Sequence, residues 1–354
     1  MWWKDIYVSA SAAWLGRRED VWDAVAEGRY DAAEAARDEY HAVRVADDVH
    51  PPDMAVAAAR LAVERSAVPT GDFALVAHAS VGFQGRDHWV PASYIQARTV
   101  AGSATALDIR QASNGGLAAL DLAASWLAAR SESRAALVTT ADRYGLPEFD
   151  RYRSDNGLPR GDGAAAMVLS RGEGAGTTAV ARLLSTVLSG DSTHEGAYRG
   201  TSPWGEPRAG RTVPVDLRAR TREYLATGAT GDAVVAALTA GQQRALKQAL
   251  AEAEVKADEV ARYVFPNGRW WNSDLDLDRT TWEWGRQVGH MGAGDQAAAF
   301  THLVETRAVR AGDRVVLSGA GVGMNFGCAV LEMLRIPDWE TPENAPGTWV
   351  EESL

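Results

Sequence analysis

Short apolar runs alternate along the chain with alanine-rich stretches in which apolar residues recur at helical spacing. Such alternation predicts strands covered by helices, as in an α/β fold. The strands predicted in the first half are residues 5–10, 73–77, 106–109, 135–139 and 164–169. The helices predicted there are residues 21–26, 54–68 and 114–130, the second with Asp53 as its N-cap. The apolar character of the runs at 73–77, 106–109 and 135–139 predicts fully buried strands.

The second half of the chain repeats this order of elements. In the first half a Gly-rich segment at Ser113 opens a helix, and a strand follows from Arg134. In the second half a Gly-rich segment at His290 opens a helix, and a strand follows from Arg314. Each half then ends with a glycine turn and an apolar strand. This repetition predicts two α/β halves, residues 1–174 and 175–354, related by a pseudo-twofold axis that brings the two helix entries together.

Composition and charge exclude several classes of protein. The chain has 354 residues, of which 46% are apolar and 23% charged, so disorder is excluded. It lacks both the roughly 18-residue apolar run of a membrane helix and the pattern of a signal peptide, which predicts a cytoplasmic protein with no membrane partner. The net charge of −11 argues against nucleic acid as a partner. The single cysteine, Cys328, excludes disulfides and cysteine zinc sites; no metal is expected, and a buried apolar role suits it better than catalysis.

The two helix entries carry the candidate chemistry. Ser113 at a helix N-terminus is placed as a nucleophile, because the free N–H groups there favour an oxyanion. Serine needs a base and a group that orients the base, and His290 and Asp295 can supply both if the glycines between them interrupt the helix. The alternative is structural: Ser113 as an N-cap, His290 as a loop histidine and Asp295 as a helix-terminal carboxylate.

Three further groups of residues are candidates for the functional site, and each also has a purely structural interpretation. One is a set of arginines that could hold a coenzyme A phosphate, a phosphopantetheine arm or an acidic carrier protein, or could form a solvated face: Arg208, Arg211, Arg218, Arg220 and Arg222. Another is a set of tryptophans that could line a pocket or serve the core: Trp270, Trp271, Trp282 and Trp284. His194 is a second site candidate or a surface-loop histidine.

Three segments in order resemble the ketoacyl synthase III enzymes of the thiolase fold. Residues 107–120, around Gln-Ala-Ser-Asn-Gly-Gly, resemble their nucleophile segment. Residues 160–170 resemble their glycine turn, and residues 312–327 their C-terminal loop and strand. The resemblance implies a five-layered αβαβα sandwich and a homodimer. It also implies a tunnel for an acyl-pantetheine arm, donated by acyl-CoA or an acyl carrier protein, and no permanently bound cofactor.

Departures from that family define the predicted function. Ser113 replaces the family's cysteine, Phe265 or Pro266 stands where condensing members carry a histidine, and His290 replaces an asparagine. A divergent branch from antibiotic pathways matches this set; it contains acyltransferases and the starter-unit synthases of aromatic polyketides, and the Ser/His/Asp version resembles the latter especially.

The resulting prediction is an acyltransferase of the EC 2.3.1 type that acylates Ser113 and passes the acyl group to a small hydroxyl, amine or thiol acceptor. Backbone amides of Ser113 and Val322 are the expected oxyanion hole, because the glycines flanking Val322 permit close approach. Asn267 is a secondary site candidate. The alternatives are a priming ketosynthase that condenses the acyl group with malonyl carrier protein, and a non-catalytic partner subunit.

Overall fold

The structure is a computed structural model, and it describes residues 1–172, 175–204, 213–269 and 276–340. Its strands are β1 (Ile6–Leu15), β2 (Arg17–Asp20), β3 (Ala42–Val45), β4 (Phe73–Ala79), β5 (Thr105–Ile109), β6 (Ala135–Asp142), β7 (Gly163–Arg171), β8 (Ala181–Gly190), β9 (Val260–Val264), β10 (Arg314–Gly321) and β11 (Asn325–Met333). Its α-helices are α1 (Val21–Ala26), α2 (Ala32–Asp38), α3 (Pro51–Ser66), α4 (Pro91–Arg98), α5 (Gly115–Ala129), α6 (Ala175–Thr178), α7 (Gly196–Arg199), α8 (Leu217–Leu225), α9 (Gly231–Glu252), α10 (Trp282–Gly285) and α11 (Asp295–Glu305). Two short 3₁₀ helices, η2 (Ala112–Asn114) and η8 (Gly292–Gly294), precede α5 and α11.

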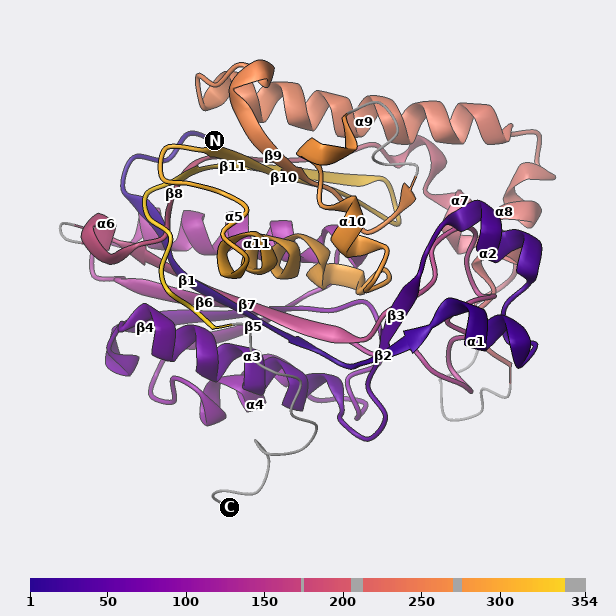
Figure 1. Cartoon of the computed structure of the whole chain (residues 1–354), viewed down its shortest axis with the longest axis horizontal. Coiled ribbons are helices and arrows are strands. Elements are labelled where there is room, and N and C mark those ends of the chain that lie inside the picture. The colour runs from indigo at the N-terminus through magenta and orange to yellow at the C-terminus, as the bar shows by residue number, and fades with distance from the viewer. Residues whose placement is uncertain (173–174, 205–212, 270–275, 341–354) are drawn as a thin grey trace.

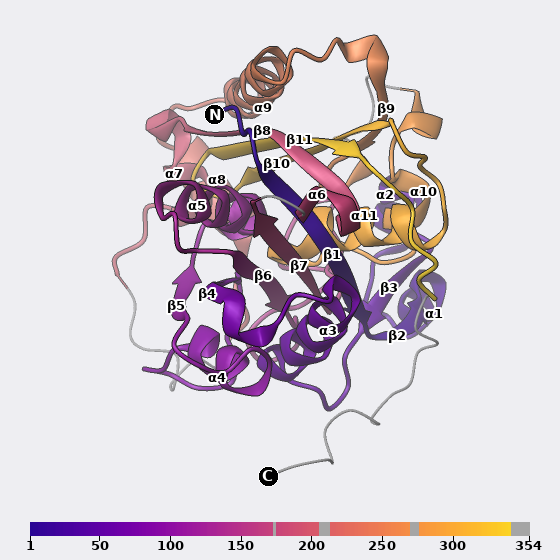
Figure 2. The same ribbon diagram turned by 90° about the vertical axis from the view of Figure 1, so that its left-hand side faces the viewer.

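The long strands form layers separated by helices. Nine strands are joined in the order β5-β4-β6-β7-β1-β8-β11-β10-β9. The junction between β1 and β8 consists of two residue pairs, Tyr7 with Arg182 and Val8 with Ala181, so the strands of the first and second halves form two groups joined at a narrow seam. Figure 1 shows α9 above the β8–β11 group, α5 and α11 between the two groups, and α3 and α4 below the other group. The same five layers are visible after a quarter turn (Figure 2). The predicted five-layered α/β arrangement is therefore confirmed; the division at residues 174/175 remains a prediction with which this grouping is compatible.

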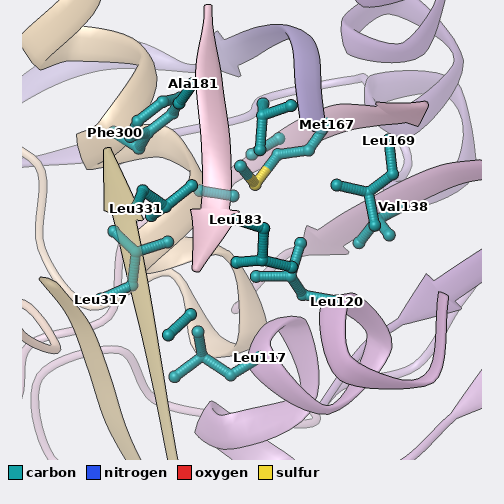
Figure 3. Close-up of a cluster of buried hydrophobic side chains, with 14 of the residues drawn as sticks. Leu117, Leu120, Val138, Met167, Leu169, Ala181, Leu183, Phe300, Leu317 and Leu331 are labelled. Atoms are coloured by element: carbon teal, nitrogen blue, oxygen red, sulfur yellow. The ribbon is translucent and has the colours of Figure 1, made fainter. Parts of the chain in front are cut away.

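The central core lies where both strand groups face the buried helices. Figure 3 shows side chains from these layers pointing toward one another. They come from α5, α11 and five strands: Leu117, Leu120, Val138, Met167, Leu169, Ala181, Leu183, Phe300, Leu317 and Leu331. Burial of so many apolar side chains, at roughly 1.5–3 kcal/mol each, fixes the two helices between the strand groups. The helix entries at η2 and η8 are thereby held at the centre of the molecule.

Two local predictions were wrong. The helix predicted from residue 54 begins at Pro51, because proline suits the first helical turn, and His50 rather than Asp53 is the N-cap. Asp53 lies inside the first turn, and its carboxylate accepts a hydrogen bond from Tyr94 at 2.5 Å. The strand β5 is not fully buried: it is an edge strand, and its Leu107 is 38% exposed. Within the described residues β5 pairs with β4 alone, so one side of the strand has no neighbouring strand to cover it.

Candidate active site

The first helix entry presents Ser113 in a sharp strand-to-helix turn. After β5 ends at Ile109, Ala112 adopts a positive φ of 48°, and Ser113 lies in η2 directly before α5. A positive φ costs a non-glycine residue roughly 1–3 kcal/mol, so packing must hold the turn in place. Gly321 provides part of that packing: a Cβ atom there would lie 2.5 Å from the carbonyl oxygen of Gln111. Glycine at 321 thus allows the second half to press against the turn that carries Ser113.

The second helix entry places His290 against Ser113. The Oγ of Ser113 lies 2.7 Å from Nε2 of His290, and Nδ1 of His290 lies 2.5 Å from Oδ2 of Asp295. All three side chains are buried. The backbone of His290 is fixed as well, because its N–H donates to Pro159 at 2.9 Å and its carbonyl accepts from Gly161 at 3.1 Å. The three predicted residues are therefore in contact, in the order that a nucleophile, a base and an orienting carboxylate would require.

A break between His290 and the helix makes this arrangement possible. Gly292 has φ +61° and begins η8, and Asp295 is the first residue of α11. A Cβ at residue 292 would lie 2.3 Å from Oδ2 of Asp142, so the turn is closely packed as well as left-handed. Asp142 is buried and accepts a hydrogen bond from the N–H of Ala293 at 3.1 Å. Its burial raises the pKa of this carboxyl to about 7.

Asn267 supports the orienting carboxylate. Its backbone N–H donates to Oδ2 of Asp295 at 2.7 Å, and its side-chain amide donates to Oδ1 at 3.3 Å and to the carbonyl of Gly289 at 2.9 Å. The backbone N–H of Met291 donates to Oδ1 of Asp295 at 2.7 Å. Asp295 thus accepts hydrogen bonds on both oxygens, which fixes the plane of the carboxylate and the ring of His290.

A pocket opens at Ser113 and His290. Its wall combines backbone of the β10–β11 turn, apolar side chains and one pair of charged side chains: Ser113, Asp155, Leu158, Arg160, Tyr198, Leu238, Pro266, His290, Ala320, Gly321 and Val322. Val322 therefore lies on the same pocket as Ser113, where an oxyanion hole would be needed. Pro266 lines the pocket, whereas Phe265 is buried and stacks on Tyr263 with 6.0 Å between ring centroids. The residue that faces Ser113 from this segment is thus a proline, which has no side-chain hydrogen-bond donor.

Other sequence candidates lie elsewhere. Nδ1 of His194 lies 2.8 Å from the hydroxyl of Tyr224, and in the described part of the chain His194 has no contact with the three assembled residues. Trp282 packs edge-on against Tyr40 at 5.2 Å in a buried cluster, and Trp284 stacks on His302 at 5.2 Å. Both tryptophans thus have structural roles. Trp270 and Trp271 lie outside the described residues.

The arginine segment is divided in the structure. Arg208 and Arg211 lie outside the described residues. Arg218 is half-buried and donates to both carboxylate oxygens of Glu34, at 2.7 and 2.9 Å, and to the carbonyl of Asp155 at 2.7 Å. Arg220 is half-buried as well, whereas the side chain of Arg222 is 70% exposed. Arg218 is thus engaged within the fold, whereas Arg222 is exposed and forms a surface ion pair with Asp216 at 3.9 Å.

Several polar groups near the site were missed from the sequence. Asp142 is the last residue of β6, and Asp155 and Arg160 lie on the segment between β6 and β7, where the sequence offered only a glycine turn as a signal. Tyr40 was missed too, and its hydroxyl donates to the carbonyl of Asn267. Cys328 is buried, and desolvation raises the pKa of its thiol, which suits the apolar role expected for it.

Comparisons with known proteins show the family and the fold of this chain. The family model of 3-oxoacyl-(acyl-carrier-protein) synthase III matches residues 107–191, and the model of its C-terminal part matches residues 250–333. The structure of ChlB3, described as an acyltransferase, is 32% identical over 95% of this chain and 100% of its own, with a TM-score of 0.87. The chain belongs to the 3-oxoacyl-(acyl-carrier-protein) synthase III family. It is therefore an acyl-transferring or condensing enzyme.

More distant structures share the fold. The synthase FabH from Pseudomonas aeruginosa is 21% identical, covering 94% of this chain and 100% of its own, with a TM-score of 0.75. OleA from Xanthomonas campestris is 20% identical, covering 94% and 99%, with a TM-score of 0.73. The predicted thiolase fold is thus confirmed. No curated protein sequence matches the chain. Among the described helices, none is long and apolar enough to cross a membrane.

Proposed function

We propose that this family member is an acyltransferase of specialised metabolism that acts through an ester on Ser113. The observation that carries the proposal is the chain of contacts from Ser113 Oγ to His290 Nε2 and from His290 Nδ1 to Asp295. It takes an acyl thioester of coenzyme A or of an acyl carrier protein as donor, as the family name implies, and a hydroxyl, amine or thiol as acceptor. The description of ChlB3 as an acyltransferase supports this choice.

The geometry supports two balanced half-reactions. In the first, Ser113 Oγ attacks the thioester carbonyl as His290 Nε2 takes its proton. The carbon–sulfur bond breaks, and the departing thiolate receives that proton. In the second, His290 takes a proton from the acceptor, which attacks the ester carbonyl, and Ser113 leaves and regains a proton. Asp295 keeps the hydrogen of His290 on Nδ1, so Nε2 is free to accept.

A priming ketosynthase is the second candidate, because the family model and FabH are named as synthases. Condensation requires donors for a thioester enolate. Pro266 lines the pocket but has no side-chain donor, and His290 is already hydrogen-bonded to Ser113. Transfer to a heteroatom forms no enolate and needs no such donors, so it suits the site better. A homodimer in the cytoplasm that contacts an acyl carrier protein completes the proposal.

Intact-mass spectrometry with a panel of acyl-CoA donors tests the nucleophile. We expect wild type to gain the mass of one acyl group, and Ser113→Ala to gain none. Cys328→Ala is the control for acylation of the single thiol and should load like wild type. An adduct that persists in Ser113→Ala would refute the assignment, and a wild type that loads neither from coenzyme A nor from carrier protein would favour the non-catalytic subunit.

A labelled malonyl carrier protein separates transfer from condensation. The loaded enzyme is incubated with malonyl carrier protein labelled at the free carboxylate, and released carbon dioxide is counted. We expect no labelled carbon dioxide and discharge of the acyl group onto oxygen, nitrogen or sulfur acceptors. Label release together with a β-ketoacyl product would overturn the transferase proposal in favour of the priming ketosynthase.

A further inference from the structure

One pair of charged side chains lines the pocket beside Ser113 and has no part in the mechanism above. Asp155 and Arg160 lie on the segment between β6 and β7, and both line the pocket with Ser113 and His290. Arg160 is only 6% exposed, and its Nη2 donates to Oδ2 of Asp155. The rest of the wall is mainly apolar side chains and backbone, so this pair supplies the charged side chains of the wall.

The guanidinium of Arg160 is incompletely hydrogen-bonded. Buried charged groups normally have several hydrogen-bond partners, and a guanidinium offers five N–H donors. Neighbouring Arg151 follows this rule: it donates to both carboxylate oxygens of Asp162 and to the carbonyls of Arg44, Tyr144 and Arg160. Arg160 donates to Asp155, and within the described chain its buried Nε has no partner.

The surroundings of Arg160 stabilise its charge without using up its donors. The guanidinium carbon lies 5.5 Å from the ring centroids of both Tyr144 and Phe149, which provides cation–π attraction. A structural ion pair would be expected to satisfy its own donors, as Arg151 does. Arg160 thus brings a positively charged guanidinium to the pocket wall next to a carboxylate, whereas its unpartnered Nε is enclosed by protein and is not the atom that a ligand would meet.

The charges nearby decide which ligand suits this pair. Arg160 is the positive group, and Asp155 and Asp295 are the negative groups that act on it most directly. Tyr198 also lines the pocket, and burial together with the charge of Asp155 raises its pKa to about 12, so it is a neutral phenol. Arg160 and Asp155 line the pocket and their charges cancel, and Asp295 lies behind His290, so the wall has no net positive charge to attract an anionic acyl group. A neutral hydroxyl is favoured, because it can accept from Arg160 and donate to Asp155.

We infer that the pocket selects acyl groups that carry a neutral hydroxyl, which binds between Arg160 and Asp155. The inference rests on the proposed function, because it assumes that the acyl group is loaded on Ser113. A hydrogen bond to a charged group makes roughly a tenfold difference or more to binding, so a hydroxylated donor should be preferred over its deoxy counterpart by about that factor.

The test compares initial rates of Ser113 loading, measured by intact mass, from five donors of similar size. These are butyryl-CoA, its 2-, 3- and 4-hydroxy derivatives, and the anionic succinyl-CoA. We expect wild type to load at least one hydroxybutyryl group about tenfold faster than butyryl and to load succinyl slowest. In Arg160→Met the hydroxybutyryl-to-butyryl ratio should fall to about one. The exposed Arg310 provides a matched control, and Arg310→Met should keep the wild-type ratio.

A second variant keeps the inference testable if Arg160→Met does not fold. Asp155→Asn removes one negative charge beside Arg160, so the succinyl-to-butyryl ratio should rise. Equal loading of butyryl and all three hydroxybutyryl groups by wild type would overturn the inference while leaving Ser113 acylation intact. An unchanged ratio in folded Arg160→Met would also overturn it. If wild type loads none of the five acyl groups, whether they are presented on coenzyme A or on an acyl carrier protein, the proposed function itself fails.

Discussion

Replacing Asp295 with asparagine tests the contact on which proton transfer depends. Oδ2 of Asp295 accepts from His290 Nδ1 at 2.5 Å and from the N–H of Asn267 at 2.7 Å, and Oδ1 accepts from the N–H of Met291 at 2.7 Å. An asparagine has one oxygen and one NH₂ group, so it leaves one of these backbone N–H groups without an acceptor in either orientation. Only the His290 side can adapt, because the imidazole can change tautomer and accept from the new NH₂ group.

This adaptation removes the catalytic base. With Nδ1 accepting, the hydrogen of His290 moves to Nε2, which then donates to Ser113 instead of receiving its proton. We expect Ser113 acylation to slow by about 10⁴-fold, as loss of the orienting carboxylate does in other Ser-His-Asp sites. The unpaired N–H of Asn267 should lower the free energy of unfolding by about 1–3 kcal/mol, a loss that removal of a buried charge partly offsets.

Single-turnover loading followed by intact mass measures the acylation rate, and thermal unfolding followed by circular dichroism measures stability. Asp258 is exposed and provides a matched control, since Asp258→Asn changes charge equally without touching the site. The reasoning would be refuted by an Asp295→Asn enzyme that acylates within tenfold of wild type at an unchanged melting temperature. Asp295 would then be a terminal residue of α11 and nothing more.

Three further predictions concern other parts of the structure. In Gly292→Ala the new side chain would have to accept φ +61° and a Cβ 2.3 Å from a carboxylate oxygen. Denaturant titration should therefore show a larger fall in the free energy of unfolding than for the control Gly312→Ala, where φ is +91°, the space is open and strain alone costs roughly 1–2 kcal/mol. Arg218→Met should lower the melting temperature because its bonds to Glu34 are lost, whereas charge reversal at exposed Arg222 should raise the KM for the donor at low salt if that side chain meets the donor. Burial lowers the pKa of His78 to about 4, so its neutral form stabilises the fold above pH 6.5, and this contribution is lost as pH falls toward 4. The stability advantage of wild type over His78→Gln should therefore shrink by about 3 kcal/mol between pH 7 and pH 4; a pH-independent difference would contradict this.

Local pattern was sufficient for most elements. The bounds of α1 agree with the helix predicted at 21–26, and β4, β6, β7 and β10 lie where apolar runs predicted strands. These segments carry their own signal, because apolar periodicity and turn residues act over a few positions. The start of α3 was misplaced because a proline pair suits both a turn and a first helical turn. The exposure of β5 depends on its place at the sheet edge, which composition does not encode.

The candidate site also has one part that the sequence predicted and another that only the tertiary structure decided. The residues Ser113, His290 and Asp295 could be named from the sequence, because glycine breaks mark both helix entries and the repeat predicts that the entries meet. The support of Asp295 by Asn267, the engagement of Arg218 with Glu34 and the exposure of Arg160 to the pocket were decided by tertiary structure. Each depends on which segments far apart in the chain become neighbours when the layers pack. A charged residue in a turn has the same local pattern whether it faces water, an ion-pair partner or a pocket, so its role is set only by what the packed fold places beside it.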